Sequence, residues 1–346
     1  GYQTNLNGKI HFYCDLFIDR SQNSAVLFGN QKFEKKIPQR ISNFLHIKQT
    51  YRFDSKMKFR AHSNNFEAIQ NILKSFQAAS RLSNSIVFKI STTSIQLITN
   101  PSARSHHLLS RCELIRSLLF DEYVLKGFSE QDNFIYFDVR SDTLSQVLHS
   151  LQNNLKSLKL KLMNGSKGRF VLSITAEYPT FKADRIIRYQ VYIDILNRNI
   201  WNSLDEYRLD PINVSLILPP FKQISSAIES LSSMSQYAIF SSKVINPSKA
   251  YVAIGVCSDS MIIKSKFSDL EIYSQKQVNS ENNSAFADQC IYKARIDIRR
   301  VNQALIALAN FKPTAIIFQI SNEKAICMHF FNDMANFKII LPHFDV

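Results

Sequence analysis

Apolar residues recur at helical spacing in four stretches of the chain, and most of the remainder after residue 57 alternates between apolar and polar positions. Phe66, Ile69, Leu73 and Phe76 are three or four residues apart, which places them on one side of an amphipathic helix. Short runs such as Ile86–Ile90, bounded by polar turns, are typical of strands. Similar helical patterns cover Leu144–Leu151, Phe221–Leu231 and Val301–Leu308. The sequence therefore predicts an α+β fold.

Two strand-and-helix patterns occur twice in the chain. Ile291–Leu308 resembles Ile135–Leu151, and Val139 to Leu151 match Ile296 to Leu308 at an offset of 157 residues. The helix pattern Phe221–Leu231 matches Phe66–Phe76 at an offset of 155 residues. Two pairs in the same order at nearly one spacing predict a duplicated domain.

The repeat predicts the organisation of the chain. We expect an N-terminal domain over residues 57–196, an interdomain connector over 197–211 and a C-terminal domain over 212–346. Residues 1–56 have no counterpart in the repeat, and we expect them to lie outside the fold and to be poorly ordered. Because the chain begins with Gly and not with Met, we also expect it to be a fragment or to carry an upstream extension. The polar run 275–289 is expected to be a mobile loop.

The charge balance points to polyanionic partners. Lys and Arg number 42 against 28 Asp and Glu, which gives a formal net charge of +14. Such an excess favours nucleic acid or an anionic membrane surface, with solubilising lysines as the plain alternative. A membrane-surface protein needs a helix with a broad Lys/Arg side, and none of the four helix patterns has one. No apolar run approaches the roughly 18 residues of a membrane span.

The chemistry of an enzyme or a metal site is not recognisable in the sequence. The five cysteines are scattered without a C-x-x-C spacing, and His106–His107 has no ligand partner at a metal-binding spacing. Neither a phosphate-binding glycine motif nor a nucleophile elbow occurs. We therefore expect a non-enzymatic protein without a cofactor or a metal. An enzyme would need a pocket with clustered titratable groups.

Several segments in order resemble one family. They are Met57–Ala61, Ile195–Trp201, Leu216–Lys222, Ile296–Arg300 and Ile340–Pro342. Together they resemble the Hus-one family, which supplies one subunit of the nine–one–one DNA-damage checkpoint clamp, a heterotrimeric relative of PCNA. The resemblance covers Met57 to Val346, and Met57 falls where the family's first methionine lies.

The resemblance implies a PCNA-like DNA clamp protomer, in which each half packs two helices on antiparallel sheets. It implies a nuclear, non-enzymatic subunit that encircles double-stranded DNA without reading its sequence, promotes checkpoint kinase activation and assists repair. The implied partners are Rad-nine and Rad-one type subunits, a clamp loader and repair enzymes, with no membrane. The alternative is a PCNA-type homotrimeric replication clamp.

In such a ring the polar sides of the helices would face DNA. The candidate DNA-facing residues are Lys74, Arg81, His149, Lys222, Arg299 and Arg300, with Lys156 at the rim. Acids share these helices, at Glu67, Asp142 and Glu229, and Asp297 stands near a helix cap. We therefore expect weak contacts with phosphates, which position a protein without reading bases. Arg299 and Arg300 fall in a first helical turn, where cations cost a few tenths of a kcal/mol, roughly.

Overall fold

The computed structural model describes residues 11–13, 57–99, 108–151, 154–165, 168–181, 184–204, 209–257, 261–273 and 290–344. The predictions for residues 1–56 and for the loop 275–289 lie outside the described residues, apart from His11–Tyr13. These three residues form strand β1, which pairs in parallel with Ile186–Arg188. The pair His106–His107 is likewise outside the described part.

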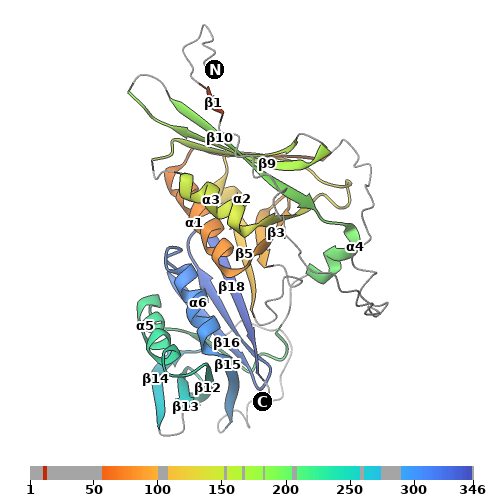
Figure 1. Ribbon diagram of the computed structural model, residues 1–346. Coiled ribbons are helices and arrows are strands. Elements are labelled where there is room, and N and C mark those ends of the chain that lie inside the picture. Colours follow the sequence, from red (N-terminus) through yellow and green to blue (C-terminus); the bar gives the residue numbers. More distant parts are fainter. Residues whose placement is uncertain are drawn as a thin grey trace, which may run out of the picture.

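The first half of the fold contains the same succession of elements twice (Figure 1). Each copy, called a passage below, consists of one strand, one helix and three strands. A short helix and one extra strand, α2 and β6, separate the two passages. The helices are α1 (Phe66–Leu82), α2 (Arg116–Leu119) and α3 (Ser141–Ser150). The strands are β2 (Lys58–Ser63), β3 (Ser85–Ile90), β4 (Ser94–Thr99), β5 (Leu109–Ile115), β6 (Glu122–Lys126), β7 (Ile135–Arg140), β8 (Ser157–Asn164), β9 (Phe170–Tyr178) and β10 (Arg185–Ile195).

The second half repeats this order without the two extra elements. Its helices are α5 (Phe221–Ser232) and α6 (Ile298–Leu308). Its strands are β11 (Val214–Ile217), β12 (Tyr237–Asn246), β13 (Lys249–Cys257), β14 (Ile262–Glu271), β15 (Ile291–Asp297), β16 (Ala315–Ser321), β17 (Ala325–Phe331) and β18 (Ala335–Pro342). The repeated sequence patterns fall on equivalent elements, β7–α3 with β15–α6 and α1 with α5, so the predicted duplication is confirmed.

The two passages within each half exchange their first strands. Strand β2 pairs with β8, and β7 pairs with β3. The second half does the same, because β11 pairs with β16 and β15 with β12. Each sheet therefore contains a strand from the other passage, and neither passage can complete its sheet alone.

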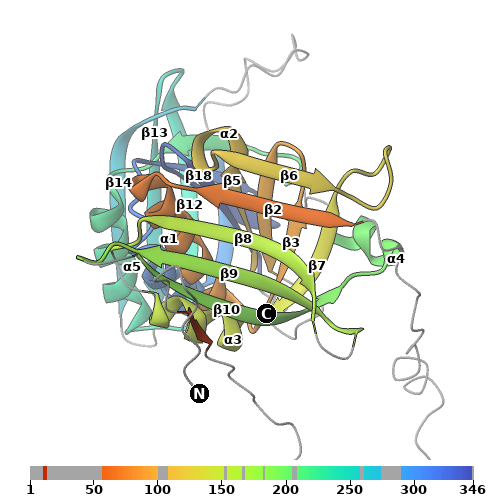
Figure 2. The same cartoon turned by 90° about the horizontal axis from the view of Figure 1, so that it is seen from above.

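One sheet continues from the first half into the second. Strand β18 pairs antiparallel with β5, with Ala335 opposite Leu114 and Ile340 opposite Leu109. In this sheet the strand order is β11-β16-β17-β18-β5-β4-β3-β7-β10-β9-β8-β2-β6, while β14-β13-β12-β15 form a separate four-stranded sheet. Figure 2 shows the sheets of the first half from above.

The helices form a single layer on one side of the sheets. Helix α1 contacts both α3 and α6, and α6 contacts α5, so the order across the layer is α3, α1, α6, α5. Their apolar sides enter a common core. There Phe88 stacks on Phe137 at 5.0 Å and meets the edge of Phe76 at 5.3 Å. Such aromatic pairs add about 0.5–1.5 kcal/mol beyond the area that they bury.

The chain between the two halves is anchored by a short helix that the sequence analysis did not predict. Helix α4 (Arg198–Trp201) leads into the 3-10 turn η3 (Asn202–Leu204). Trp201 is buried against Val87 and Tyr136 on the face of the sheet opposite the helix layer. The domain bounds 57–196, 197–211 and 212–346 stay predictions.

Candidate nucleic-acid interface

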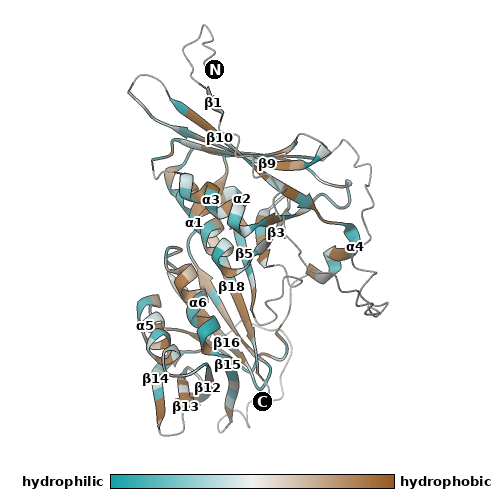
Figure 3. Ribbon diagram, viewed as in Figure 1, coloured by the Kyte–Doolittle hydropathy of each residue, from teal (hydrophilic) through white to brown (hydrophobic). Residues whose placement is uncertain are grey.

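Each long helix has one buried side and one polar side. On α6, Ile298, Val301 and Leu305 are buried, whereas Arg299 and Gln303 are exposed. The hydropathy colouring shows the same division along α1, α5 and α6 (Figure 3). The spacing of apolar residues at three and four positions produces this division, because such residues return to the same side of a helix. The polar sides together form the free surface of the helix layer.

Six of the seven candidate residues lie on this helix layer. Lys74 and Arg81 are on α1, and His149 is in the last turn of α3. Lys222 is in the first turn of α5, and Arg299 and Arg300 are in the first turn of α6. Lys74 and Arg300 are partly buried, and the others are exposed. The structure thus brings residues from both halves to one layer. Whether they face DNA stays a prediction.

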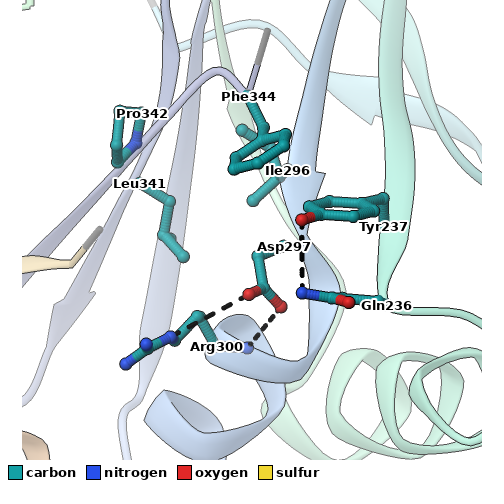
Figure 4. Close-up of a pocket in the computed structure, with 8 residues that line it drawn as sticks. All are labelled: Gln236, Tyr237, Ile296, Asp297, Arg300, Leu341, Pro342 and Phe344. Carbon is teal, nitrogen blue, oxygen red and sulfur yellow. Dashed lines mark hydrogen bonds and ion pairs between the residues drawn. The ribbon is translucent and has the colours of Figure 1, made fainter. Parts of the chain in front are cut away.

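The first turn of α6 carries two arginines next to an acidic cap, and Figure 4 shows the cap, Asp297, beside Arg300. The Asp297 carboxylate accepts hydrogen bonds from the backbone N–H groups of Arg299 at 3.1 Å and Arg300 at 3.3 Å. It also lies 3.9 Å from the Arg300 guanidinium. The cap satisfies free N–H groups and offsets the unfavourable position of cations at a helix N-terminus. Arg299 is left exposed without an ion pair among the described residues.

The start of α3 is acidic and already paired. The Arg140 guanidinium forms an ion pair with the Asp142 carboxylate. The hydrogen bond from Arg140 lowers the pKa of Asp142, so this acid is ionised at neutral pH. Because α3 contains neither Lys nor Arg, His149 is its only candidate cation. This helix therefore contributes little attraction for phosphates.

Lys156 lies outside the helix layer, in the short segment before β8. Its ammonium group forms ion pairs with Asp184 and with Glu177, the latter at 3.7 Å. The hydrogen bond to Asp184 raises the pKa of Lys156. Two acids therefore share this charge, and Lys156 offers less to a phosphate than its sequence position suggested.

A second group of cations was missed by the sequence analysis. It lies on the four-stranded sheet of the second half, on the face turned away from α5 and α6, and comprises Lys243, Lys264, Lys266, Lys293 and Arg295. The available signal was the alternation of charged and apolar residues in Ile262–Phe267 and Ile291–Asp297. Alternation shows that these side chains share a face of one strand. It does not show that the strands belong to the same sheet.

Other kinds of site find little support in the part of the chain that the structure describes. There, no group of three or more His, Cys, Asp or Glu residues is arranged to hold a metal ion. No described helix is long and apolar enough to cross a membrane. The hollow in Figure 4, of about 190 Å³, lies between the start of α6 and the end of β18 and is lined by residues such as Gln236 and Leu341. It holds one carboxylate, which caps α6.

Comparison with known families and sequences matches almost all of the chain after residue 56. The model of the family described as "Hus1-like protein" matches residues 57–345. Among curated proteins, the chain is similar to human "Checkpoint protein HUS1", with 23% identity over 290 residues. That alignment covers 83% of this chain and 99% of the human protein.

Comparison with solved structures matches sliding clamps. PCNA from Thermococcus kodakaraensis is similar with a TM-score of 0.55 and 12% identity, over 82% of this chain and 100% of that one. Proliferating cellular nuclear antigen from Entamoeba histolytica gives a TM-score of 0.58 and 13% identity, over 83% and 99% of the two chains. These likenesses show that the chain has the PCNA-like fold.

Proposed function

The chain belongs to the Hus1-like protein family, and from that premise we propose that it is a non-enzymatic subunit of a heterotrimeric checkpoint clamp that encircles double-stranded DNA. The clamp promotes checkpoint kinase activation and repair at damaged sites in the nucleus. Its other subunits are of the Rad-nine and Rad-one types, and a dedicated loader places it on DNA.

The observation that carries this proposal is the continuous layer of four helices on one side of the sheets. The order α3, α1, α6, α5 crosses both halves, and β5 and β18 keep the halves in one sheet. A ring holds DNA by enclosing it, so its lining needs only diffuse attraction to phosphates. Five Lys and Arg residues against three Asp and Glu within these helices fit that requirement.

A checkpoint clamp is favoured over a replication clamp of the PCNA type. The human relative is named a checkpoint protein and the matching family model is described as Hus1-like, whereas the PCNA structures share only 12% and 13% identity. The two functions differ in assembly, because a replication clamp of this type is a homotrimer. Strand β14 is one of the two edge strands of its sheet. Its free backbone groups suit the addition of a strand from a neighbouring subunit.

Assembly tests this proposal directly. The chain is expressed alone and together with the Rad-nine and Rad-one type subunits of the same organism, and the masses are measured by mass photometry. We expect a complex with one copy of each subunit and no closed homotrimer. A stable ring formed by this chain alone would support the replication clamp instead.

Retention on DNA tests the lining. Arg299→Ala with Arg300→Ala should shorten the lifetime of the loaded clamp on circular DNA. Each lost phosphate contact should also lower the salt-dependence slope by about 0.9. Lys159→Ala with Lys161→Ala, two cations on the sheet of the first half, is the matched control. Equal retention of both variants at every salt concentration would show that Arg299 and Arg300 do not contact the enclosed DNA. The result of the assembly experiment would not be affected.

A further inference from the structure

The four-stranded sheet of the second half carries concentrated positive charge on the face opposite the helices. Along its strands, residues such as Phe240, Val252 and Ala294 enter the core, so their neighbours project from the other face, here called the outer face. Five cations lie on it, and they are called the outer-sheet cations below. They are Lys243 on β12, Lys264 and Lys266 on β14, and Lys293 and Arg295 on β15.

The register of the strands places four of these cations at the ends of two adjacent rows. One row crosses the sheet as Lys264, Gly255, Ile239 and Arg295. The next row runs as Lys266, Ala253, Ser241 and Lys293. Strands lie about 4.8 Å apart, so the two ends of a row are separated by roughly 14 Å, and the rows themselves by about 6.7 Å.

Three of the four middle positions of these rows are low, and the fourth, Ile239 beside Arg295, is 46% exposed, so the surface is a shallow trough that Ile239 interrupts at one place. Gly255, Ala253 and Ser241 have small side chains or none. A Cβ atom on Gly255 would lie 3.3 Å from Cγ of Lys264. The absent side chain therefore lets Lys264 lie across the sheet toward the centre of the trough.

Two of the charged groups are held by aromatic rings. The ammonium of Lys266 lies 4.4 Å from the centre of the Tyr251 ring, and the guanidinium of Arg295 lies 4.9 Å from that of Tyr237. Tyr237 also stacks on Phe344 at 4.6 Å. These contacts restrict the cations to the face of the sheet. They also occupy the rings, which leaves the surface with fixed charge rather than free stacking platforms.

The acids of this sheet that the structure describes lie beyond the two rows, with Asp297 opposite Tyr237 and Glu271 at the end of β14. None of the ion pairs found among the described residues involves an outer-sheet cation. The sheet of the first half differs, because Glu122 pairs with Arg60 at 3.2 Å and Glu177 with Lys156 at 3.7 Å. Cations held close together without acids repel one another and raise the local potential, which favours an external anion with several charges.

We propose that the outer face of this sheet binds the phosphodiester backbone of a nucleic-acid strand that lies outside the ring. Cations on alternate residues of two strands suit a chain with a charge on every unit. An acidic protein segment would be bound less well, since it carries its charges at the ends of flexible side chains, whereas a phosphodiester carries them on its backbone at a regular spacing. The site does not depend on the helix layer or on ring assembly.

Binding by the full chain tests the proposal. Fluorescein-labelled oligothymidylate and a labelled hairpin duplex are titrated with the chain at several NaCl concentrations, with a polyglutamate peptide of equal charge in parallel. Lys264→Glu with Lys266→Glu should weaken nucleic-acid binding about tenfold and lower the salt slope by about two. The matched control is Lys159→Glu with Lys161→Glu, which reverses two cations in the same alternate arrangement on the first sheet. This control should change affinity less than threefold, by about 0.6 kcal/mol or less.

Photo-crosslinking of the unaltered chain gives a second measurement that needs no variant. An oligonucleotide containing 5-bromodeoxyuridine should crosslink to peptides from β12–β15. The proposal is overturned if crosslinks map only to the helices, or if the control variant weakens binding as much as Lys264→Glu with Lys266→Glu. It is also overturned if polyglutamate binds as tightly as the oligonucleotide with the same dependence on these two lysines.

Discussion

The helix layer and the outer face of the four-stranded sheet each carry five Lys and Arg residues, yet they hold them differently. On the helices the cations are spread over three elements from both halves, with Glu67, Asp142 and Glu229 among them. On the sheet they occupy adjoining rows without an acid between them. Spread and partly neutralised charge gives weak attraction over a wide area. Concentrated charge gives a local potential that attracts a polyanion to one place.

Under the two proposals above, the difference follows from what each surface would have to do in a clamp. An enclosed duplex cannot leave, so a lining with strong contacts would only hinder its sliding. A strand outside the ring has no enclosure, and it is retained only as long as contacts hold it. Net charge alone therefore does not identify the DNA-binding surface of such a chain. The arrangement of acids around the cations is the more informative property.

The largest predicted effect is a loss of stability, and it is expected from a residue on the buried side of the helix layer. Leu305 on α6 is 1% exposed, and the adjacent Ile306 is 55% exposed. Leu305→Ala should lower the free energy of unfolding by about 2–5 kcal/mol, because it leaves a cavity under the helix. Ile306→Ala should change it by less than about 0.5 kcal/mol. Urea titrations followed by circular dichroism measure both. Equal losses would show that α6 does not present Ile306 to solvent as described.

An acid placed in the trough should make the sheet resemble the helix layer. Ala253 lies between Lys266 and Ser241 in the register. Ala253→Glu should weaken oligonucleotide binding about tenfold, because the new carboxylate neutralises Lys266 and repels phosphates. Thr175→Glu is the control, since Thr175 lies between Lys159 and Arg188 on the first sheet. Fluorescence anisotropy at low salt measures both variants. A loss of equal size in the control would mean that the oligonucleotide responds to net charge alone.

Removal of an acid should make the helix layer resemble the sheet. Glu229 is exposed near the end of α5, where a negative charge opposes the helix dipole. Glu229→Gln should therefore leave stability unchanged or slightly higher, and it should prolong retention of the assembled clamp on circular DNA about twofold at low salt. The effect should disappear at high salt. Glu130→Gln, on an exposed loop outside both surfaces, should not change retention.

The helices were predictable because their signal is local. The spacing of Phe66, Ile69 and Phe76 identifies the buried side of α1, and Ile69 and Phe76 are indeed buried. The prediction was wrong for Phe66, which is 55% exposed because it is the first residue of the helix. The same holds for the cap of α6, because Asp297 directly precedes the helix. The exchange of first strands and the β5–β18 junction join residues that are far apart in the chain. No local pattern contains that information, since alternation is alike in strands that pair and in strands that do not.

The outer-sheet cations were missed for the same reason. Lys264 and Arg295 are ends of one row only because β13 and β12 lie between them. In the sequence these residues belong to two ordinary amphipathic strands separated by a long polar segment. The prediction for Lys156 was limited in a similar way, because its partner Asp184 lies 28 positions away and comes close only through the β9–β10 pairing.

The smallest effect is expected from a pair of like charges that neither surface contains. Asp138 on β7 lies opposite Asp194 on β10, where the two ends of the first half's sheets meet. Burial raises the pKa of Asp138, and the nearby Asp194 raises it further, while a hydrogen bond from Ser85 opposes the shift. The raised pKa means that ionisation costs more in the folded than in the unfolded chain. The contribution of Asp138 to the free energy of unfolding is therefore fully present below the carboxyl pKa of the unfolded chain. It is lost as the pH rises through the pKa of the folded chain.

Asp138→Asn removes that loss and keeps an oxygen that can accept the hydrogen bond from Ser85. The variant should raise the urea midpoint at pH 7, and the gain should shrink as pH falls toward the ordinary carboxyl pKa. Asp142→Asn is a suitable contrast, because Arg140 lowers the pKa of Asp142, and its removal should reduce stability at pH 7. Urea unfolding midpoints at pH 7 and at a pH near the ordinary carboxyl pKa measure the stability of both variants. A gain for Asp138→Asn that persists unchanged in acid would show that charge is not its cause, and the contrast between paired and unpaired charge would then not extend to this part of the sheet.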